Sequence, residues 1–231
     1  MQNVKPQNGP SRAGPKASVE TRPGDIRSYG DRDNRREAIL DVATEIFLSE
    51  GYASTSMSTI AARLGGSKGT LYNYFKSKEE LFEAYVRRHC AIQKHEIMAI
   101  LTEEGEPREV ITAWARRYLA VVTGDKSLNN WRVISAECQK SPEFGRIFYE
   151  SGPLLGARIL ADTLKKWADA GYFRIDDPLV AAHQFLSLLS GRIIKARLLC
   201  YLPTPTEDEI NTEADNAIRT FFAAFGAGKL V

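Results

Sequence analysis

The stretch GGSKGTLYNYFKSKEEL, residues 65–81, decides the fold. It follows STIAARL, residues 58–64, whose apolar residues fall on one face of a short helix. The paired glycines allow a sharp turn, because glycine adopts a positive φ without a Cβ penalty. Ser67 can accept a hydrogen bond from the amides that follow it, so it predicts a second short helix directly after the turn.

Two helices joined by a tight glycine turn form a helix-turn-helix, whose second helix enters the major groove of DNA. The sequence predicts these helices at residues 57–64 and 68–75, after a supporting helix at residues 35–50. Leu71 and Phe75 are spaced to face the interior. The candidate DNA contacts are small, polar or basic residues on or beside the two helices: Ser56, Ser58, Ser67, Lys68, Gly69, Thr70, Tyr72, Asn73, Tyr74 and Lys78.

The composition of the second helix suits contact with DNA. Gly69 leaves its surface bare, so the helix can approach the sugar-phosphate backbone closely. Lys68, Tyr72 and Asn73 offer donors and acceptors to bases and phosphates. Lys78 lies at the start of the next helix, where free amides and the positive end of the helix dipole favour a phosphate.

The same stretch contains GGSKG, which matches the G-x-S-x-G nucleophile elbow of α/β-hydrolases. That elbow requires a strand directly before it. The preceding STIAARL has the spacing of an amphipathic helix, and the chain lacks the βαβ pattern of that fold. We therefore favour the helix-turn-helix.

The rest of the chain has helical periodicity and no convincing alternating strand, which predicts an all-α fold. Capping residues or first-turn prolines predict helix starts at Ser77, Pro107, Ser141-Pro142, Asp177-Pro178 and Thr206. The helix from Pro142 is expected to reach towards residue 167, and the helix from Pro178 to reach residue 199.

The predicted organisation has three parts. Residues 1–30 are rich in Pro and Gly and poor in large apolar residues, which predicts a disordered tail. Residues 31–78 are the three-helix, helix-turn-helix DNA-binding domain, and residues 79–231 form a larger helical domain.

Composition limits the possible classes of protein. A formal net charge of +2 in 231 residues requires any nucleic-acid surface to be local. No apolar run is long enough to span a bilayer, and the start has no signal-peptide stretch, so we expect a cytoplasmic protein. Cys90, Cys138 and Cys200 are odd in number and far apart, which suits reduced thiols.

Residues 54–82, STSMSTIAARLGGSKGTLYNYFKSKEELF, resemble the DNA-binding domain of the TetR family of bacterial one-component repressors. The preceding REAILDVATEIFLSEGYASTSM, residues 36–57, is similar to the family's first helix and its exit. Leu64 and Gly66 depart from the family pattern, in which a small alanine and an aliphatic residue are common. The second departure removes a small core anchor.

The resemblance implies that residues 86–231 sense a ligand and form a homodimer. Residues 176–199, DDPLVAAHQFLSLLSGRIIKARLL, resemble the penultimate helix of AcrR-type members. In that family the last two long helices pair with their copies. The apolar residues of these helices are therefore the candidate dimer contacts: Phe185, Leu189, Ile193, Ile218 and Phe222.

Several residues of the larger domain are candidates for lining a pocket. Aromatic side chains at helical spacing can surround an apolar inducer, although such residues are more often plain core. A histidine in an apolar segment can orient a ligand. The candidates are Trp114, Trp131, Phe148, Trp167 and His183. His89, Cys90 and His95 do not share one helix face, so neither a metal site nor another cofactor is expected.

The sequence as a whole predicts a homodimeric repressor that leaves a palindromic operator in double-stranded DNA when a small apolar or aromatic molecule binds its C-terminal domain. Two other classes stay open. An all-α enzyme would need a catalytic constellation, and we find none in the sequence. An architectural DNA-binding protein would have a filled core without a cavity. An activator would share the same domains.

Overall fold

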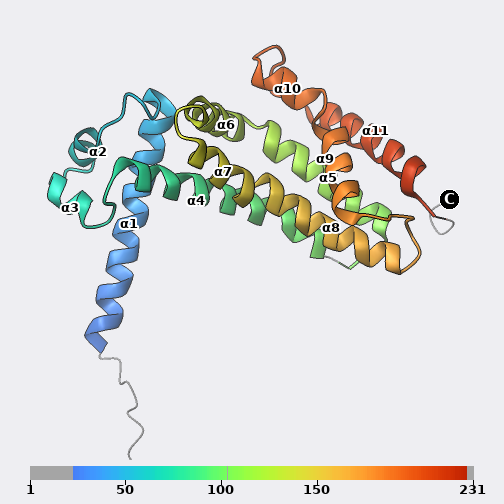
Figure 1. The fold of residues 1–231 in the computed structure, drawn as a ribbon, viewed down its shortest axis with the longest axis horizontal. Helices are drawn as coiled ribbons and strands as arrows, with labels where there is room; N and C mark the ends of the chain where they lie inside the picture. Colours follow the sequence, from blue (N-terminus) through green and yellow to red (C-terminus); the bar gives the residue numbers. More distant parts are fainter. Residues whose placement is uncertain (1–22, 103, 228–231) are drawn as a thin grey trace, which may run out of the picture. The chain divides into compact units, whose positions relative to one another are not determined.

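The computed structural model describes residues 23–102 and 104–227, which form helices and one isolated antiparallel bridge between Phe173 and Gly226 (Figure 1). The predicted all-α class is therefore confirmed. In chain order the elements are α1 (Pro23–Glu50), α2 (Met57–Arg63), α3 (Lys68–Tyr72), α4 (Lys78–Met98), the 3₁₀ helix η1 (Ala99–Thr102), α5 (Pro107–Thr123), α6 (Asp125–Cys138), α7 (Pro142–Ser151), α8 (Pro153–Asp169), α9 (Pro178–Ser190), α10 (Ile193–Leu198) and α11 (Glu207–Phe225).

The chain divides into two units after residue 37, so that the described residues 23–37 belong to the first and those from 38 to 227 to the second. In the first unit, α1 begins at Pro23, whereas the sequence placed the start of this helix at residue 35. Proline suits a first helical position, because its φ is already helical and it has no amide hydrogen to leave unpaired. Residues 23–30 therefore depart from the predicted disordered tail, and residues 1–22 lie outside the described residues.

The second unit contains two cores, and we call the first of them the N-terminal core. It gathers side chains of α1 to α4 around a cluster of rings, in which the centroids of Phe47 and Tyr52 lie 5.1 and 4.5 Å from that of Phe82. Phe144 of α7 joins this cluster, 4.7 Å from Phe82. Such ring pairs each contribute about 0.5–1.5 kcal/mol beyond the burial of their area. Because α4 and α7 continue past this core, the predicted domain boundary after residue 78 stays a prediction.

The second core, which we call the C-terminal core, is built from η1 and helices α4, α5, α6, α8, α9, α10 and α11. Trp114, Phe185 and Phe221 are fully buried at its centre. Phe185 contacts both of the other rings, at centroid distances of 6.0 Å to Trp114 and 4.7 Å to Phe221. These contacts hold α5, α9 and α11 together within one chain.

This core corrects the prediction of the dimer contacts. All five predicted residues are buried inside a single chain: Phe185, Leu189, Ile193, Ile218 and Phe222. A 3.6-residue apolar period identifies the face of a helix that leaves water, but it does not say whether the same chain or a second chain covers that face.

Most predicted helix starts are confirmed, but two predicted helices are interrupted. Thr206 and Glu209 form the expected reciprocal capping box of α11. The run from Pro142 is split into α7 and α8 at Gly152, because Pro153 lacks an amide hydrogen and disfavours helical φ/ψ in the residue before it. The run from Pro178 is split into α9 and α10 at Gly191 and Arg192.

Candidate DNA-binding surface and ligand cavity

The turn between α2 and α3 depends on Gly65. Its φ of +64° lies in the left-handed region that favours glycine. From this position the amide of Gly65 donates to the Ala62 carbonyl oxygen, and the amide of Gly66 donates to the Ala61 carbonyl oxygen, both at 3.1 Å. This pair of bonds is a Schellman motif, which satisfies carbonyl groups at the end of α2.

Ser67 begins α3 as predicted, since its Oγ accepts a hydrogen bond of 3.1 Å from the Thr70 amide. The helix is shorter than predicted and ends at Tyr72, with Asn73 as its C-cap. Leu71 and Phe75 are buried, which confirms that they face the interior. The helix-turn-helix therefore consists of two helices joined by a glycine turn, and a helix, not a strand, precedes the GGSKG sequence.

The outer face of α3 is open to solvent. Lys68, Gly69 and Asn73 are exposed, and Tyr72 retains 42% of its surface. A Cβ atom added at Gly69 would meet only the Ser67 Oγ, at an ordinary 3.7 Å. Packing within the chain therefore does not require glycine here. The remaining candidates, Ser56, Ser58, Ser67 and Thr70, are also exposed, and Tyr74 is half-buried.

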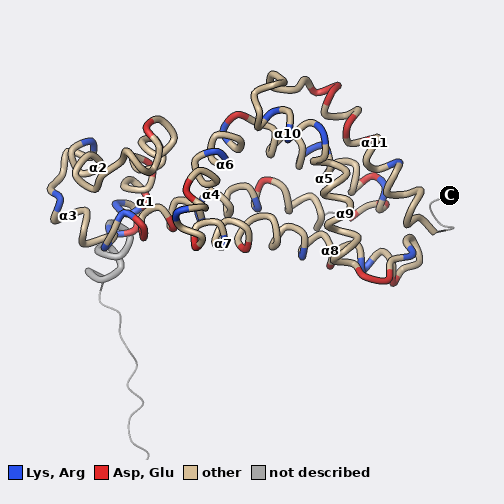
Figure 2. Tube along the Cα trace, turned by 45° about the horizontal axis from the view of Figure 1, so that its top comes forward, with Lys and Arg blue, Asp and Glu red and all other residues tan. Residues whose placement is uncertain are grey.

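The charge around α3 is of one sign. Residues 51–78 contain Arg63, Lys68, Lys76 and Lys78 and no Asp or Glu, although the whole chain has a net charge of only +2. Figure 2 shows Lys and Arg positions on α2 and α3 without an acidic neighbour on either helix. This local excess of positive charge suits a phosphate backbone.

Lys78 has a structural role that the sequence did not reveal. Its Nζ donates to the carbonyl oxygens of Tyr52 and Thr55, at 2.9 and 3.0 Å, and lies 4.1 Å from the ring centroid of Tyr52. The Tyr52 hydroxyl donates to Glu79 Oε1 at 3.2 Å, and burial together with the Glu79 charge raises the pKa of Tyr52. An ammonium group has three N–H donors, so one remains for a phosphate.

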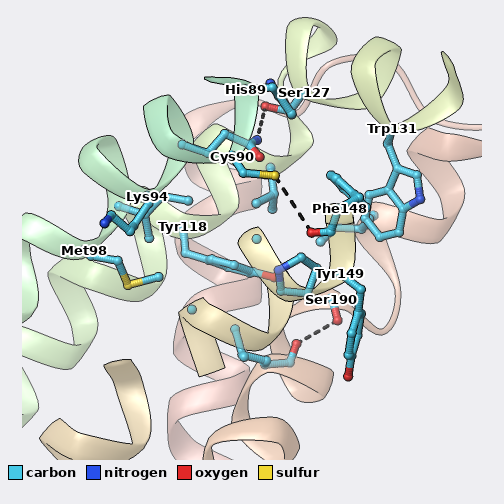
Figure 3. A pocket seen from close by; sticks show the side chains of 18 of the residues that line it. His89, Cys90, Lys94, Met98, Tyr118, Ser127, Trp131, Phe148, Tyr149 and Ser190 are labelled. Atoms are coloured by element: carbon cyan, nitrogen blue, oxygen red, sulfur yellow. Dashed lines mark hydrogen bonds between the residues drawn. The ribbon is translucent and has the colours of Figure 1, made fainter. Parts of the chain in front are cut away.

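The helical body contains a partly open cavity of about 260 Å³ (Figure 3). Three of the five predicted ligand residues line it, namely Trp131, Phe148 and His183. The other two lie outside the lining of this cavity. Trp114 is fully buried and stacks 5.3 Å from Tyr118, and Trp167 packs against Phe173 of the core at 6.2 Å.

Most of the cavity wall was missed by the sequence analysis. Helix α4 contributes residues whose spacing places them on one face of the helix, and this spacing is the feature from which the sequence could have indicated them. They are His89, Cys90, Gln93, Lys94, Ile97 and Met98. Helices α5 to α10 contribute the rest. Gln93 Nε2 donates to Ser127 Oγ at 2.8 Å, which links α4 to α6 at this wall.

Three titratable groups of the cavity are uncharged near neutral pH, and burial shifts the pKa of each further towards its neutral form. It lowers the pKa of His89 to about 4, and the positive charge of Lys126 acts in the same direction. Burial also raises the pKa of Cys90 and of Tyr118, each to about 12, although the charge of Arg87 partly opposes this at Cys90. The cavity therefore presents a neutral imidazole, a neutral thiol and a neutral phenol.

A basic helix-turn-helix on a helical body with a ligand-sized cavity defines a one-component transcriptional regulator. Residues 39–85 match the family described as "Bacterial regulatory proteins, tetR family". Residues 109–227, about half of the chain, match the "AefR-like transcriptional repressor, C-terminal domain". The chain belongs to the TetR family of helix-turn-helix transcriptional regulators.

Individual relatives agree with this assignment. The regulator BetI of Rhizobium meliloti is 28% identical over 151 residues, which are 62% of this chain and 74% of BetI. The structure of a TetR-family regulator from Mesorhizobium loti has a TM-score of 0.79 at 28% identity, covering 85% of this chain and 98% of that one. The Flavonoid-responsive Regulator FrrA has a TM-score of 0.74 at 32% identity, covering 84% and 98%.

No helix within the described ranges is both long enough and apolar enough to cross a lipid bilayer.

Proposed function

We propose that this regulator is a homodimeric repressor that binds a palindromic operator through α3 and leaves it when a small aromatic or apolar molecule enters the cavity. The observation that carries the proposal is that the same helices, α4 and α7, both line the cavity and enter the N-terminal core. The similarity to FrrA supports an aromatic ligand, and the similarity to AefR-like repressors supports repression.

The proposed DNA contacts are the exposed residues around α3. Lys68, Tyr72 and Asn73 would reach bases and phosphates in the major groove, while Gly69 allows close approach of the backbone. Ser56, Ser58 and Ser67 would donate to phosphates at the helix starts, with Thr70 and Tyr74 beside them. Lys78 would offer its third N–H to a phosphate while it holds the loop before α2.

The proposed coupling runs along two helices. On α4, Phe82 and Tyr85 belong to the N-terminal core, and His89 lies in the cavity wall within the next turn or two. On α7, Phe144 contacts Phe82 and Phe148 lines the cavity one turn later. A ligand that binds more tightly when α4 or α7 is displaced would move α3, the helix proposed to enter the major groove. The coupling free energy equals the difference between its binding free energies for the displaced and undisplaced conformations.

The proposed dimer uses the outer faces of α9 and α11 in place of the buried residues predicted from the sequence. Val180 and Leu188 are large apolar side chains exposed on α9, and they border a shallow groove with Ala224 and Phe225 of α11. Two copies joined here would present two α3 helices to half-sites about 34 Å apart, one helical turn of DNA. Exposed apolar patches of this kind mark association surfaces.

We further propose that the protein acts in the cytoplasm, without a cofactor and without catalysing a reaction. Relatives are transcriptional regulators, and regulation needs only differential binding of ligand and DNA.

The test is selection of bound sequences from a random duplex pool by the purified full chain at a stated salt concentration. We expect enrichment of a palindrome with half-sites one helical turn apart. A single unpaired half-site would contradict the dimer. A folded protein that enriches no sequence, with or without added aromatic compounds, would contradict the operator-binding function.

A further inference from the structure

The cavity contains polar groups that the protein itself does not satisfy. His89 on α4 is only 8% exposed, and its imidazole makes no hydrogen bond to another residue in the described part of the chain. The Tyr118 hydroxyl on α5 likewise has no hydrogen-bond partner among the described residues. Figure 3 shows both side chains at the cavity. Neither group is among the inaccessible side-chain atoms that lack a partner, so a molecule in the cavity can reach each of them.

The charges around the cavity disfavour a charged ligand, and a cation most of all. No Asp or Glu lines the cavity within the described residues, and its only lysine, Lys94, is exposed. A cation placed inside would lose its hydration without gaining a carboxylate, and it would also face the positive charge of Lys126 beside His89. The two ammonium groups near the cavity, Lys94 and Lys126, are exposed, so water screens their attraction for an anion.

The shape and the apolar wall favour an aromatic molecule of modest size. Trp131 and Phe148 lie with their ring centroids 6.1 Å apart at one side of the cavity, and Ile97, Met98 and Leu186 add aliphatic surface. The volume of about 260 Å³ is slightly below the usual range for ligand pockets, about 300–1,000 Å³. The space therefore suits one or two fused rings.

We infer that the cavity selects an uncharged one- or two-ring aromatic compound that carries a hydroxyl group, with His89 and Tyr118 as two separate positions of the wall that can recognise a hydroxyl. The inference rests on the proposed function, because it names the ligand class of the same cavity. The neutral imidazole of His89 accepts the hydroxyl hydrogen, and the Tyr118 phenol donates to a ligand oxygen.

Burial supports these two roles. With a pKa of about 4, His89 keeps an unprotonated ring nitrogen at pH 7, and with a pKa of about 12, Tyr118 keeps its hydrogen. Besides His89 and Tyr118, the charged or titratable groups around the site are Arg87, Lys94, Lys126, Cys90, Tyr149 and His183.

The test uses four probes built on one ring system: 2-naphthol, naphthalene, 2-naphthoate and 2-naphthyltrimethylammonium. Binding to the full chain is measured by titration calorimetry at pH 7. We expect 2-naphthol to bind at least about tenfold more tightly than either ion, because burial of an unpaired charge costs more than one hydrogen bond contributes.

Two variants identify the recognising residues. Tyr118→Phe removes only the hydroxyl, and His89→Phe removes the imidazole nitrogens. At least one of them is expected to weaken 2-naphthol about 3- to 10-fold, the effect of one hydrogen bond, and both are expected to leave naphthalene unchanged. His95→Phe changes an exposed residue of α4 outside the cavity wall and serves as the matched control. Since Tyr118→Phe keeps the ring, it remains informative if His89→Phe fails to fold.

Three results would overturn the inference. The first is a cation or an anion of this probe set that binds as tightly as 2-naphthol. The second is an equal loss of naphthalene and 2-naphthol in the variants, which would indicate a purely structural role. The third is the failure of all four probes to bind a protein that still binds its operator. Loss of operator binding itself would count against the proposed function and is measured separately.

Discussion

Replacing Gly69 by alanine is expected to separate folding from DNA binding. In the free protein the new methyl group would meet only the Ser67 Oγ at 3.7 Å, and Gly69 lies inside α3 with an ordinary backbone conformation. Alanine in place of glycine within a helix stabilises by about 0.5–1 kcal/mol. At the surface that meets DNA, however, the methyl group would hold the helix away from the sugar-phosphate backbone.

We therefore expect Gly69→Ala to raise the Tm by about 1–3 °C, as a gain of this size does in a domain of this length. Its operator affinity should fall at least about tenfold, or about 1.4 kcal/mol. Thermal unfolding and fluorescence anisotropy with the selected operator measure the two effects on the same preparation. Unchanged operator affinity would refute close approach at this position.

Gly65→Ala is the matched contrast, because it adds the same methyl group four residues earlier. There φ is +64°, and nothing lies within 4 Å of the added Cβ atom. A left-handed conformation costs a residue with a side chain about 1–2 kcal/mol. This variant should lose stability, whereas Gly69→Ala should gain it.

Three further predictions follow from the surface and the cavity. Tyr72→Ala should weaken operator binding while the protein stays folded and dimeric in sedimentation, because the ring is 42% exposed; an unaltered affinity would remove Tyr72 from the contacts. Lys78→Ala should reduce the magnitude of the slope of log K against log salt by about 1, as expected for the loss of one phosphate contact. It should also lower stability by about 1–2 kcal/mol, because two hydrogen bonds to backbone carbonyl groups are lost. An unchanged slope would leave Lys78 with a structural role only. The pKa of His89 is lowered to about 4 in the folded chain, so between about pH 6.5 and 4 the unfolded chain binds more protons, and the free energy of unfolding should decrease by about 3 kcal/mol as the pH is lowered through this window. Denaturant unfolding of His89→Gln should lack this decrease, whereas the exposed His95→Gln should keep it. Equal pH profiles for the wild type and both variants would contradict the buried neutral imidazole.

Local physical rules were enough to predict the glycine turn between α2 and α3 and the starts of several helices. Ser67 and Thr206 accept the capping bonds that their positions in the sequence predict, and Gly65 has the positive φ that the turn needs. These features depend on a few neighbouring residues. The sequence therefore contains the signal for the turn and for the helix starts, although it placed the end of α3 at residue 75 and not at Tyr72.

Features that depend on distant packing were not predictable in the same way. The apolar periods of α9 and α11 were real, yet Phe185 and Phe222 face their own chain. Trp114 and Trp131 are both tryptophans within predicted helical segments, but Trp114 is buried in the C-terminal core whereas Trp131 lines the cavity. A cavity is the space that side chains of several helices leave unfilled, and no single helix carries that information.

Lys78 illustrates a third case, in which a residue has two roles. Its sequence position predicts a phosphate contact at a helix start. The bonds to Tyr52 and Thr55 join residues 23 or more positions away in the chain, so only the folded structure shows that the same ammonium group holds the loop before α2.

The most direct test of α3 as the reading helix is a site-specific photocrosslink to operator DNA. Azidophenylalanine, which has nearly the shape of tyrosine, replaces Tyr72 in one protein and Tyr149 or Tyr201 in two controls. All three tyrosines are exposed, at 42%, 51% and 81%, so accessibility alone does not favour position 72. We predict a crosslink to operator bases from position 72 and none from the controls. Crosslinking from position 149 or 201 without crosslinking from position 72 would contradict the assignment of α3 to the major groove.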